Sequence, residues 1–315
     1  MIETNIKISA CGYSAYFRSD LGGNCYRLCH EPTGSELLRT PKDEEELFSE
    51  VYLFGNPILF PPNRIRDGKF TFEGRKYIFP INEPSTGCHI HGELYKKSFA
   101  IKKLDSDRVI FEYSAKSGEY LGFPHAFTVK REYFIDEKGL HESVDVTNES
   151  DENIPFMLAF HTTLNIPFSS CGDGDSCKLT IPVTEEQLRD KNYLPTLEYA
   201  SGRERDISLC SGRYAITASP LSSLYGVSGK CAYIRDEKSG LTLVYEGDEN
   251  YKYRMLWRRD GADFVVIEPQ TCAIDCFHLE KSAEEKGLIV IKPHESLKLH
   301  TRFAIGTTPF AKETF

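Results

Sequence analysis

The sequence predicts an all-β protein built from antiparallel sheets, a sandwich or a barrel with very few short helices. Short segments rich in β-branched and aromatic residues recur along the whole chain, separated by turn residues at near-regular spacing. Helical periodicity is sparse, and strands do not alternate with helices as they do in a parallel sheet. The 315 residues show no internal repeat, low-complexity segment or linker rich in Ser, Pro or Gly. We therefore expect residues 1–315 to form one domain.

The first elements expected are a pair of strands, at residues 6–10 and 13–17. A helix is expected to begin at Thr40, an N-cap residue type, because Pro41 then occupies the favoured first helical position. Acidic and then apolar residues at helical spacing extend this helix toward Tyr52. The run 184–187 matches a capping box and predicts one brief helical turn. No other segment predicts a helix.

Strands and turns dominate the rest of the chain. A hairpin is expected around Glu73 and Gly74, because aromatic residues alternate with polar ones on both sides of this pair. The same alternation predicts strands at 109–113, 126–135, 140–146, 232–234, 241–245, 288–291 and 297–303. Turn residues at 136–139 and 236–240 join two pairs of these strands.

A buried strand that ends in a carboxylate is the most informative stretch. Residues 264–267 are apolar and rich in β-branched types, and Glu268 follows them. Strand alternation places Phe264, Val266 and Glu268 on one face, and Pro269 is expected to end the ladder because it lacks an N–H. A carboxylate held against an apolar surface has a raised proton affinity and can act as a general base or acid. The alternative is a Glu in an ion pair at the rim of the sheet.

His161 repeats this pattern of an apolar strand that ends in an ionisable group. The strand expected at 155–160 places Phe160 on one face and Ala159 and His161 on the other. A neutral His with a pKa near 6.5 can give or take a proton at cellular pH. A hydrogen-bonded core histidine is the alternative reading.

Two further clusters of polar residues interrupt the β pattern. Asn63 and Arg64 follow two prolines, and an Arg held rigidly can clamp hydroxyls or anions. In an extended segment His89, His91 and Glu93 share one face, where they could hold a metal ion or hydrogen-bond a polyol. Gly92 beside His91 predicts a close approach of another part of the chain.

Composition excludes several classes of partner. Lys and Arg total 38 against 47 for Asp and Glu, and a net charge of -9 argues against nucleic acid or an anionic membrane as the main partner. No apolar run reaches the roughly 20 residues that span a bilayer. The first residues do not resemble a secretory signal, and the ten cysteines are scattered. We therefore expect a cytoplasmic protein with reduced, mostly buried thiols.

Four elements together resemble the aldose 1-epimerase (galactose mutarotase) family. Asn63-Arg64-Ile65, followed by Gly68, Phe70 and Gly74, resembles its N-R-I…G-x-F…G hairpin. His91-Gly92 resembles the family's L-H-G-G element, and the segment from His161 to Asn165 resembles its H-x-Y-F-N element. Glu268-Pro269-Gln270 resembles its E-T-Q element. The four occur in the family's order and span essentially the whole chain.

The resemblance implies a β-supersandwich with an open cleft, no cofactor and no metal. It implies that Glu268 is the general base for the anomeric hydroxyl and His161 the general acid for the ring oxygen, on opposite sides of the anomeric carbon. Arg64 and His91 would bind the sugar, and we expect Asn63, Gln270 and His89 to bind it too. The expected partner is a small-molecule sugar, a free aldohexose, bound by a monomer or a homodimer.

This sequence departs from the family pattern at three places. Glu93 stands for the second Gly of H-G-G, and Thr163-Leu164 replace Tyr-Phe after the histidine. The segment 224–227 lacks the acid of the family's later Asp-His pair. One alternative is therefore a hexose-phosphate mutarotase in which Arg66 and Lys69 bind the phosphate. Others are a non-catalytic carbohydrate-binding domain and a metal-dependent enzyme built on the His89 cluster.

Overall fold

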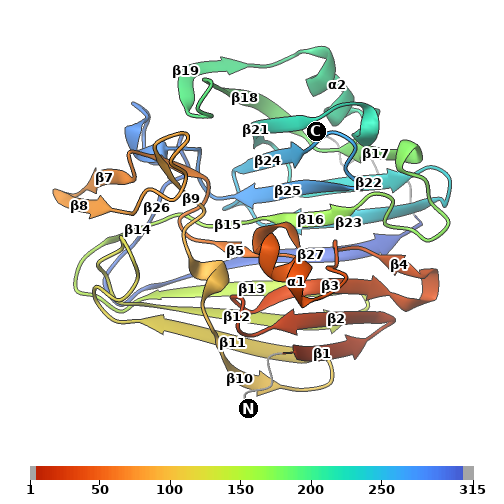
Figure 1. Cartoon of the computed structure of the whole chain (residues 1–315), viewed down its shortest axis with the longest axis horizontal. Helices are drawn as coiled ribbons and strands as arrows, with labels where there is room; N and C mark the ends of the chain where they lie inside the picture. Colours follow the sequence, from red (N-terminus) through yellow and green to blue (C-terminus); the bar gives the residue numbers. More distant parts are fainter. Residues whose placement is uncertain (1–4, 308–315) are drawn as a thin grey trace.

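A nine-stranded antiparallel sheet is the largest element of the computed structural model, which describes residues 5–307 (Figure 1). Long hairpins build its centre, as predicted from the alternating residues and the turn at 136–139. In spatial order its strands are β10 (Ala100–Leu104), β11 (Arg108–Ala115), β12 (Phe127–Asp136), β13 (Gly139–Asn148), β27 (Ser296–Gly306), β23 (Leu241–Gly247), β22 (Cys231–Asp236), β17 (Cys177–Thr180) and β20 (Tyr214–Ala215).

An eight-stranded antiparallel sheet carries the predicted Glu268 strand near its middle. Its strands in spatial order are β19 (Pro195–Ala200), β18 (Val183–Arg189), β21 (Leu221–Val227), β24 (Tyr253–Arg258), β25 (Phe264–Gln270), β15 (Ala159–Phe160) and β5 (Ile58–Leu59), with β16 (Thr162–Asn165) also paired to β25. In the view of Figure 1 this sheet lies above a four-stranded sheet formed by the first strands of the chain.

Smaller elements complete the fold. The four-stranded sheet contains β1 (Asn5–Ala10), β2 (Tyr13–Arg18), β3 (Asn24–His30) and β4 (Ser35–Glu36). Three strand pairs stand apart: β6 (Arg64–Arg66) with β9 (Cys88–Ile90), β7 (Lys69–Phe72) with β8 (Arg75–Ile78), and β14 (Ile154–Phe156) with β26 (Ile289–Ile291). The helices are α1 (Glu44–Ser49), α2 (Glu204–Cys210) and the 3-10 turns η1 (Glu31–Thr33), η2 (Val51–Leu53), η3 (Leu94–Lys96), η4 (Gly174–Ser176), η5 (Ile216–Ala218) and η6 (Cys276–His278). None of the helices described could span a membrane.

The core lies between the nine-stranded sheet and the two other large sheets. Phe17 of β2 packs its ring on Phe111 of β11 and Tyr133 of β12. The hydroxyl of Thr162 in β16 bonds that of Tyr245 in β23 at 2.8 Å. Both sheets therefore bury one face against the same partner, as the predicted β-supersandwich requires. The fold class and most of the predicted strands and hairpins are confirmed.

The helix predictions need correction. The first helix begins later than expected: Asp43 is the N-cap, and its carboxylate accepts the N–H of Glu46 at 2.8 Å. Asp43 and not Thr40 caps the helix because the Glu46 side chain also accepts the N–H of Lys42, which makes the capping reciprocal. The predicted turn at 184–187 is part of strand β18, since pairing with β19 and β21 overrides the local capping signal. Helix α2 was not predicted at all.

Two strand predictions were also imprecise. Strand β25 continues through Pro269 to Gln270, because Pro269 pairs with Arg254 of β24. The expected strand at 155–160 is interrupted, since Leu158 donates its N–H to the side chain of Thr271 instead of a strand partner. His161 lies at the interruption between β15 and β16, and its N–H bonds the carbonyl of Pro57 at 2.9 Å.

Candidate active site

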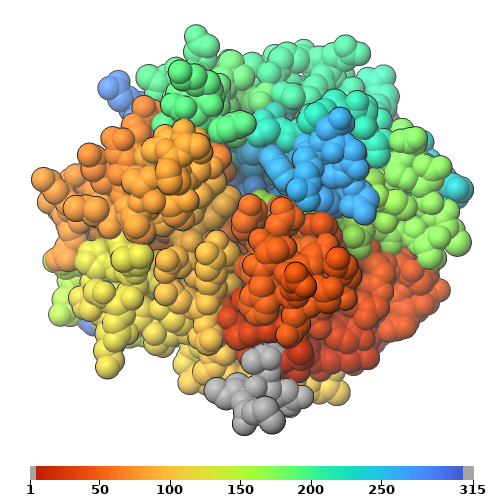
Figure 2. Space-filling view, in the orientation of Figure 1, coloured from red at the N-terminus to blue at the C-terminus, as the bar shows by residue number. Residues whose placement is uncertain are grey.

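A cleft of about 770 Å³ opens over the eight-stranded sheet. Figure 2 shows it as a hollow near the centre of the visible face, bordered by segments far apart in the sequence. The lining residues include Tyr52, Asn63, Arg64, Glu83, His91, Lys96, His161, Tyr193, Ser222, Met255, Trp257, Arg258, Arg259 and Glu268. Five of the seven residues predicted to form a site therefore meet in one cavity, although segments far apart in the chain supply them.

Glu268 lies on the floor of this cleft. Met255 pairs with it across β24, and the Phe264 and Val266 side chains share its face as predicted. The side chain is 2% exposed, and its Oε2 accepts a hydrogen bond from Gln270 Nε2 at 3.0 Å. Burial raises the pKa of this carboxyl to about 8, against the smaller opposing effects of Gln270, Arg189 and Arg64. Glu268 is therefore mostly protonated at neutral pH.

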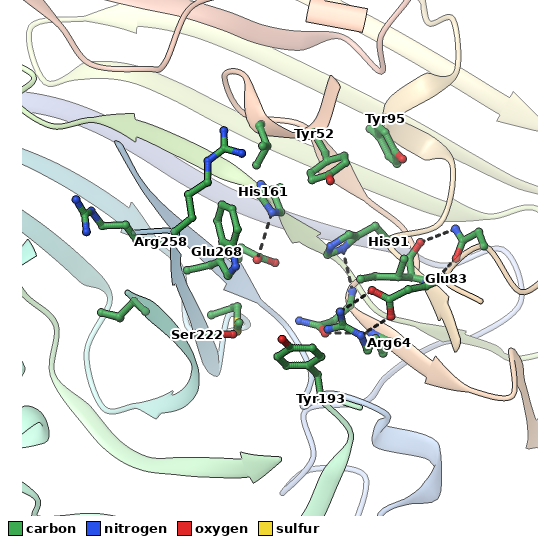
Figure 3. Close-up of a pocket in the computed structure, with 18 of the residues that line it drawn as sticks. Tyr52, Arg64, Glu83, His91, Tyr95, His161, Tyr193, Ser222, Arg258 and Glu268 are labelled. Carbon is green, nitrogen blue, oxygen red and sulfur yellow. Dashed lines mark hydrogen bonds and ion pairs between the residues drawn. The ribbon is translucent and has the colours of Figure 1, made fainter. Parts of the chain in front are cut away.

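His161 lies directly beside Glu268. Its ring is almost fully buried and meets the Tyr52 ring edge-on, with the two ring centroids 5.3 Å apart. Burial lowers the pKa of His161 to about 4, so the imidazole is neutral at neutral pH. The Nε2 atom is 3.7 Å from Glu268 Oε1, as the dashed line in Figure 3 marks.

The two side chains thus differ from expectation in one respect. We expected them on opposite sides of the ligand, but they stand next to each other on one wall. At 3.7 Å no ring fits between them. Two oxygens bonded to the same carbon lie closer together than that, so a ligand placed over both groups can touch each with one oxygen. The arrangement suits proton exchange with a geminal pair of oxygens.

His91 lies beside His161, with the ring centres 5.5 Å apart, and Arg64 lies next to His91 in Figure 3. His91 Nδ1 accepts the N–H of Asn63 at 3.3 Å, so Nε2 carries the proton and can donate into the cleft. Burial, with the neighbouring His161 and Arg64, lowers the pKa of His91 well below its usual value. Arg64 donates from Nε and Nη2 to both oxygens of Glu83, at 2.6 and 2.7 Å. This bidentate pair fixes the guanidinium and leaves Nη1 outside the pair.

His89 and Gln270 do not line the cleft. His91 has φ +63, so the extended alternation that predicted a shared face for both histidines breaks there. His89 is buried instead against Phe79, and its Nδ1 contacts the carbonyl of Pro80 at 2.7 Å. Gln270 acts through its hydrogen bond to Glu268. In the region described, no three His, Cys, Asp or Glu side chains converge as metal ligands, so the His89 cluster lacks the geometry its alternative requires.

Gly92 confirms the predicted close approach of chain segments. It has φ +59, and a Cβ there would stand 1.8 Å from the carbonyl oxygen of Phe60. The two residues form a parallel bridge. This contact places His91 at the edge of the cleft, because any larger residue at 92 would push the two backbones apart.

A buried ionic network supports the strand that carries His161. Arg131 and Glu142 are both fully buried and pair at 2.7 Å. Glu142 also accepts from Asn56, whose side-chain oxygen accepts from the Thr162 hydroxyl at 2.5 Å. Because Thr162 follows His161 in the chain, this network fixes the backbone next to His161.

Several lining residues were missed by the sequence analysis. Glu83 gave no local signal, since its partner Arg64 is brought to it by the fold. Tyr52, Tyr193 and Trp257 form aromatic walls. Trp257 could have been singled out as the one tryptophan of the chain, next to two arginines. Aromatic faces of this kind suit ligands with apolar C–H surfaces.

The residues considered as phosphate ligands, and the segment in which the family has an acidic sugar contact, lie outside the cleft. Arg66 pairs with Asp275 at 3.2 Å, and Lys69 begins strand β7; neither lines the cleft. Tyr225, in the segment without an acid, is buried with its hydroxyl on Asp206 at 2.9 Å. Glu83 instead supplies a second carboxylate inside the cleft.

Comparison with known proteins gives a consistent result. A sequence profile of the family described as aldose 1-epimerase matches residues 6–304. A galactose mutarotase-like protein from Clostridium acetobutylicum is 29% identical, with a TM-score of 0.91 over 96% of this chain and 95% of that one. Galactose 1-epimerase from Lactobacillus acidophilus NCFM shares the fold, at 16% identity and a TM-score of 0.73, with 96% and 94% coverage.

A match to a curated protein is more limited. YihR of Escherichia coli (strain K12), described as an uncharacterized protein, is 26% identical over 165 residues, which are 52% of this chain. The match spans 51% of YihR, or about half of its length.

Proposed function

Because this chain belongs to the aldose 1-epimerase family, we propose that it is an aldose 1-epimerase that interconverts the α and β anomers of an aldohexose. The observation that carries the proposal is the buried pair of Glu268 and His161, 3.7 Å apart on the floor of an open cleft. Opening a hemiacetal requires a proton to leave O1 and another to reach the ring oxygen. Both oxygens are bonded to the anomeric carbon, so adjacent acid and base groups can serve them together.

The pair exchanges a single proton. At neutral pH the two side chains hold one proton between them, and before a sugar binds this proton is on Glu268. A bound sugar donates its O1 hydroxyl to the carboxylate and accepts from the imidazolium at its ring oxygen. Both hydrogen bonds favour the charged forms, so the proton moves to His161. Glu268 then takes the O1 proton as His161 protonates the ring oxygen, which opens the ring.

Closure reverses these roles after the aldehyde has turned about its C1–C2 bond. His161 removes the proton from the former ring hydroxyl as it attacks C1, and Glu268 returns a proton to O1. We assign to His91 Nε2 and Arg64 Nη1 the binding of the sugar's other oxygens, with Glu83 fixing Arg64. Gln270 positions the Glu268 carboxyl through its hydrogen bond.

Polarimetry on freshly dissolved α-D-galactose and α-D-glucose tests the proposal. The protein should accelerate relaxation to the anomeric equilibrium. Glu268→Gln and His161→Asn should each reduce this acceleration at least about 100-fold, while circular dichroism shows the fold retained. Full activity in either variant would remove that residue from the mechanism. Saturable sugar binding without acceleration would instead indicate a carbohydrate-binding domain.

A further inference from the structure

The cleft differs in charge from the rest of the protein. The whole chain carries a formal net charge of -9. Its cleft, however, is lined by four cationic side chains and two carboxyl groups, namely Arg64, Lys96, Arg258 and Arg259 with Glu83 and Glu268. Burial raises the pKa of Glu268 to about 8, so this group adds little negative charge at neutral pH. Arg64 pairs with Glu83, and Arg259 pairs with Glu50 at 3.4 Å, so Lys96 and Arg258 are the lining cations without an ion pair within the described residues. A neutral sugar offers these two cations no opposite charge.

Arg189 adds a fifth cation beside this cleft. It lies on β18, opposite Ser222 of the cleft wall, and its Nη2 donates to both the carbonyl and the hydroxyl of Ser222. Within residues 5–307 it makes no ion pair with a carboxylate, and its Nη1 is buried without a hydrogen-bond partner. Burial, with the charge of Arg64, lowers the pKa of this guanidinium. Arg189 is therefore an anchored, partly desolvated cation, whose charge Glu186 and Glu268 stabilise only at a distance.

Arg64 provides the contrast. It lies at the same end of the cleft, and both of its bonds to Glu83 neutralise its charge. The protein thus compensates one arginine fully and leaves its neighbour uncompensated. A guanidinium whose Nη1 is buried without a hydrogen bond destabilises a fold, so a partner from outside the chain explains Arg189 better than a structural role does.

Tyr193 separates Arg189 from the open cleft. Its ring centre lies 4.7 Å from Arg64 Cζ and 5.7 Å from Arg189 Cζ, and the side chain is 46% exposed. The residue has φ +61 in the loop between β18 and β19. Figure 3 shows the ring beside Arg64 and close to Ser222. Tyr193 lines the cleft and Arg189 does not, so a ligand that reaches Arg189 from the cleft must displace this ring.

We propose that the sugar bound by this cleft carries an anionic group, a carboxylate, phosphate or sulfonate, which lies beside Arg189 at the Ser222 end. The inference rests on the proposed function, because it names the substrate class of the same cleft. The planar guanidinium fits a pair of anionic oxygens, and the Ser222 hydroxyl and Arg64 Nη1 supply further donors there. This site replaces the phosphate contacts expected at Arg66 and Lys69.

Anomer exchange measured at equilibrium by NMR tests the proposal without pure anomers. Saturation transfer between the two anomeric protons is compared for glucose, glucose 6-phosphate, glucuronate and 6-deoxy-6-sulfoglucose, after subtraction of the uncatalysed rate. We expect kcat/KM for at least one anionic sugar to exceed that for glucose by tenfold or more. The three anions distinguish which anionic group the subsite prefers. Arg189→Met should reduce this ratio by about 10- to 100-fold, as expected for losing a charged hydrogen bond.

The ratio separates the possible outcomes. Arg189 also acts electrostatically on Glu268, but that effect reaches every substrate equally and cancels in the ratio. Arg213→Met, which removes an exposed charge bonded to Ser211 outside the cleft lining, should leave the ratio unchanged. Acceleration of glucose with a ratio below ten for every anionic sugar in the wild type, or an unchanged ratio in Arg189→Met, overturns this inference alone. No acceleration of any sugar overturns the proposed function.

Discussion

Replacing Glu268 by Gln is expected to stabilise the protein at neutral and alkaline pH while removing its proposed base. Glu268 is 2% exposed, and burial raises its pKa from 4.5 to about 8. In the unfolded chain the same carboxyl ionises near its ordinary value. Between these two pKa values the unfolded state loses its proton while the folded state keeps it, so wild-type stability falls as pH rises. Gln carries no such penalty.

The size of the effect follows from the shift. Each pH unit in this window costs the wild type about 1.4 kcal/mol, which gives an upper limit of about 5 kcal/mol by pH 8. Water entering the open cleft reduces this limit, and we expect a gain of about 2 to 4 kcal/mol for the variant. Urea unfolding of both proteins from pH 5 to pH 9 measures it. Stability curves that stay parallel over this range would show that Glu268 ionises normally and would refute the reasoning.

Glu83→Gln is the matched control with the opposite sign. Burial opposes ionisation of Glu83, but hydrogen bonds from Arg64 and Thr86 outweigh it and lower the pKa below 4.5. Its contribution to stability is therefore present above pH 4.5 and is lost as pH falls through the folded-state pKa. The Glu83 variant should be less stable than the wild type at pH 7, and this difference should shrink in acid. The same experiment thus shows a gain at one cleft carboxyl and a loss at the other.

Three further predictions concern activity and packing. The value of kcat/KM should be level between about pH 4 and pH 8. It should fall below pH 4, where His161 gains a second proton for the pair, and above pH 8, where Glu268 loses the one proton that the pair holds. A rate profile with a midpoint near pH 6.5 would contradict this. Arg131→Met leaves a fully buried carboxylate without its cation and should lower the free energy of unfolding by about 3 to 5 kcal/mol in urea titrations. Gly92→Ala brings a Cβ to within 1.8 Å of the Phe60 carbonyl oxygen, so its thermal midpoint should fall by several degrees and sugar affinity should weaken with it.

The sequence predicted what depends on local periodicity. Strand β25 was recognised because its apolar and β-branched residues indicate a buried strand whatever the neighbouring strands are. The face shared by Val266 and Glu268 followed from strand geometry. The charge state of Glu268 also followed, since a carboxyl at the end of a buried strand has a raised pKa. Predictions of this kind held where one element settled the outcome.

Predictions failed where tertiary contacts decided the backbone. The shared face of His89 and His91 was lost because His91 adopts a positive φ, a conformation that its sequence does not announce. The capping box at 184–187 was overridden by pairing on both sides of β18. Glu83 and Arg189 could not be singled out from the sequence, because only the fold decides their partners. Glu83 forms an ion pair with Arg64, whereas Arg189 bonds to Ser222 and, among the described residues, not to a carboxylate.

Among the carboxyl and guanidinium groups at the cleft that make no ion pair with a charged side chain within residues 5–307, two have shifted pKa values. One is Glu268, whose raised pKa reflects this isolation, and the other is Arg189. They lie near enough to influence each other but do not form an ion pair. Within the described residues neither group has an ion-pair partner that would offset its cost of desolvation. Their separation is explained if one ligand satisfies both, offering a hydroxyl to Glu268 and an anionic group to Arg189.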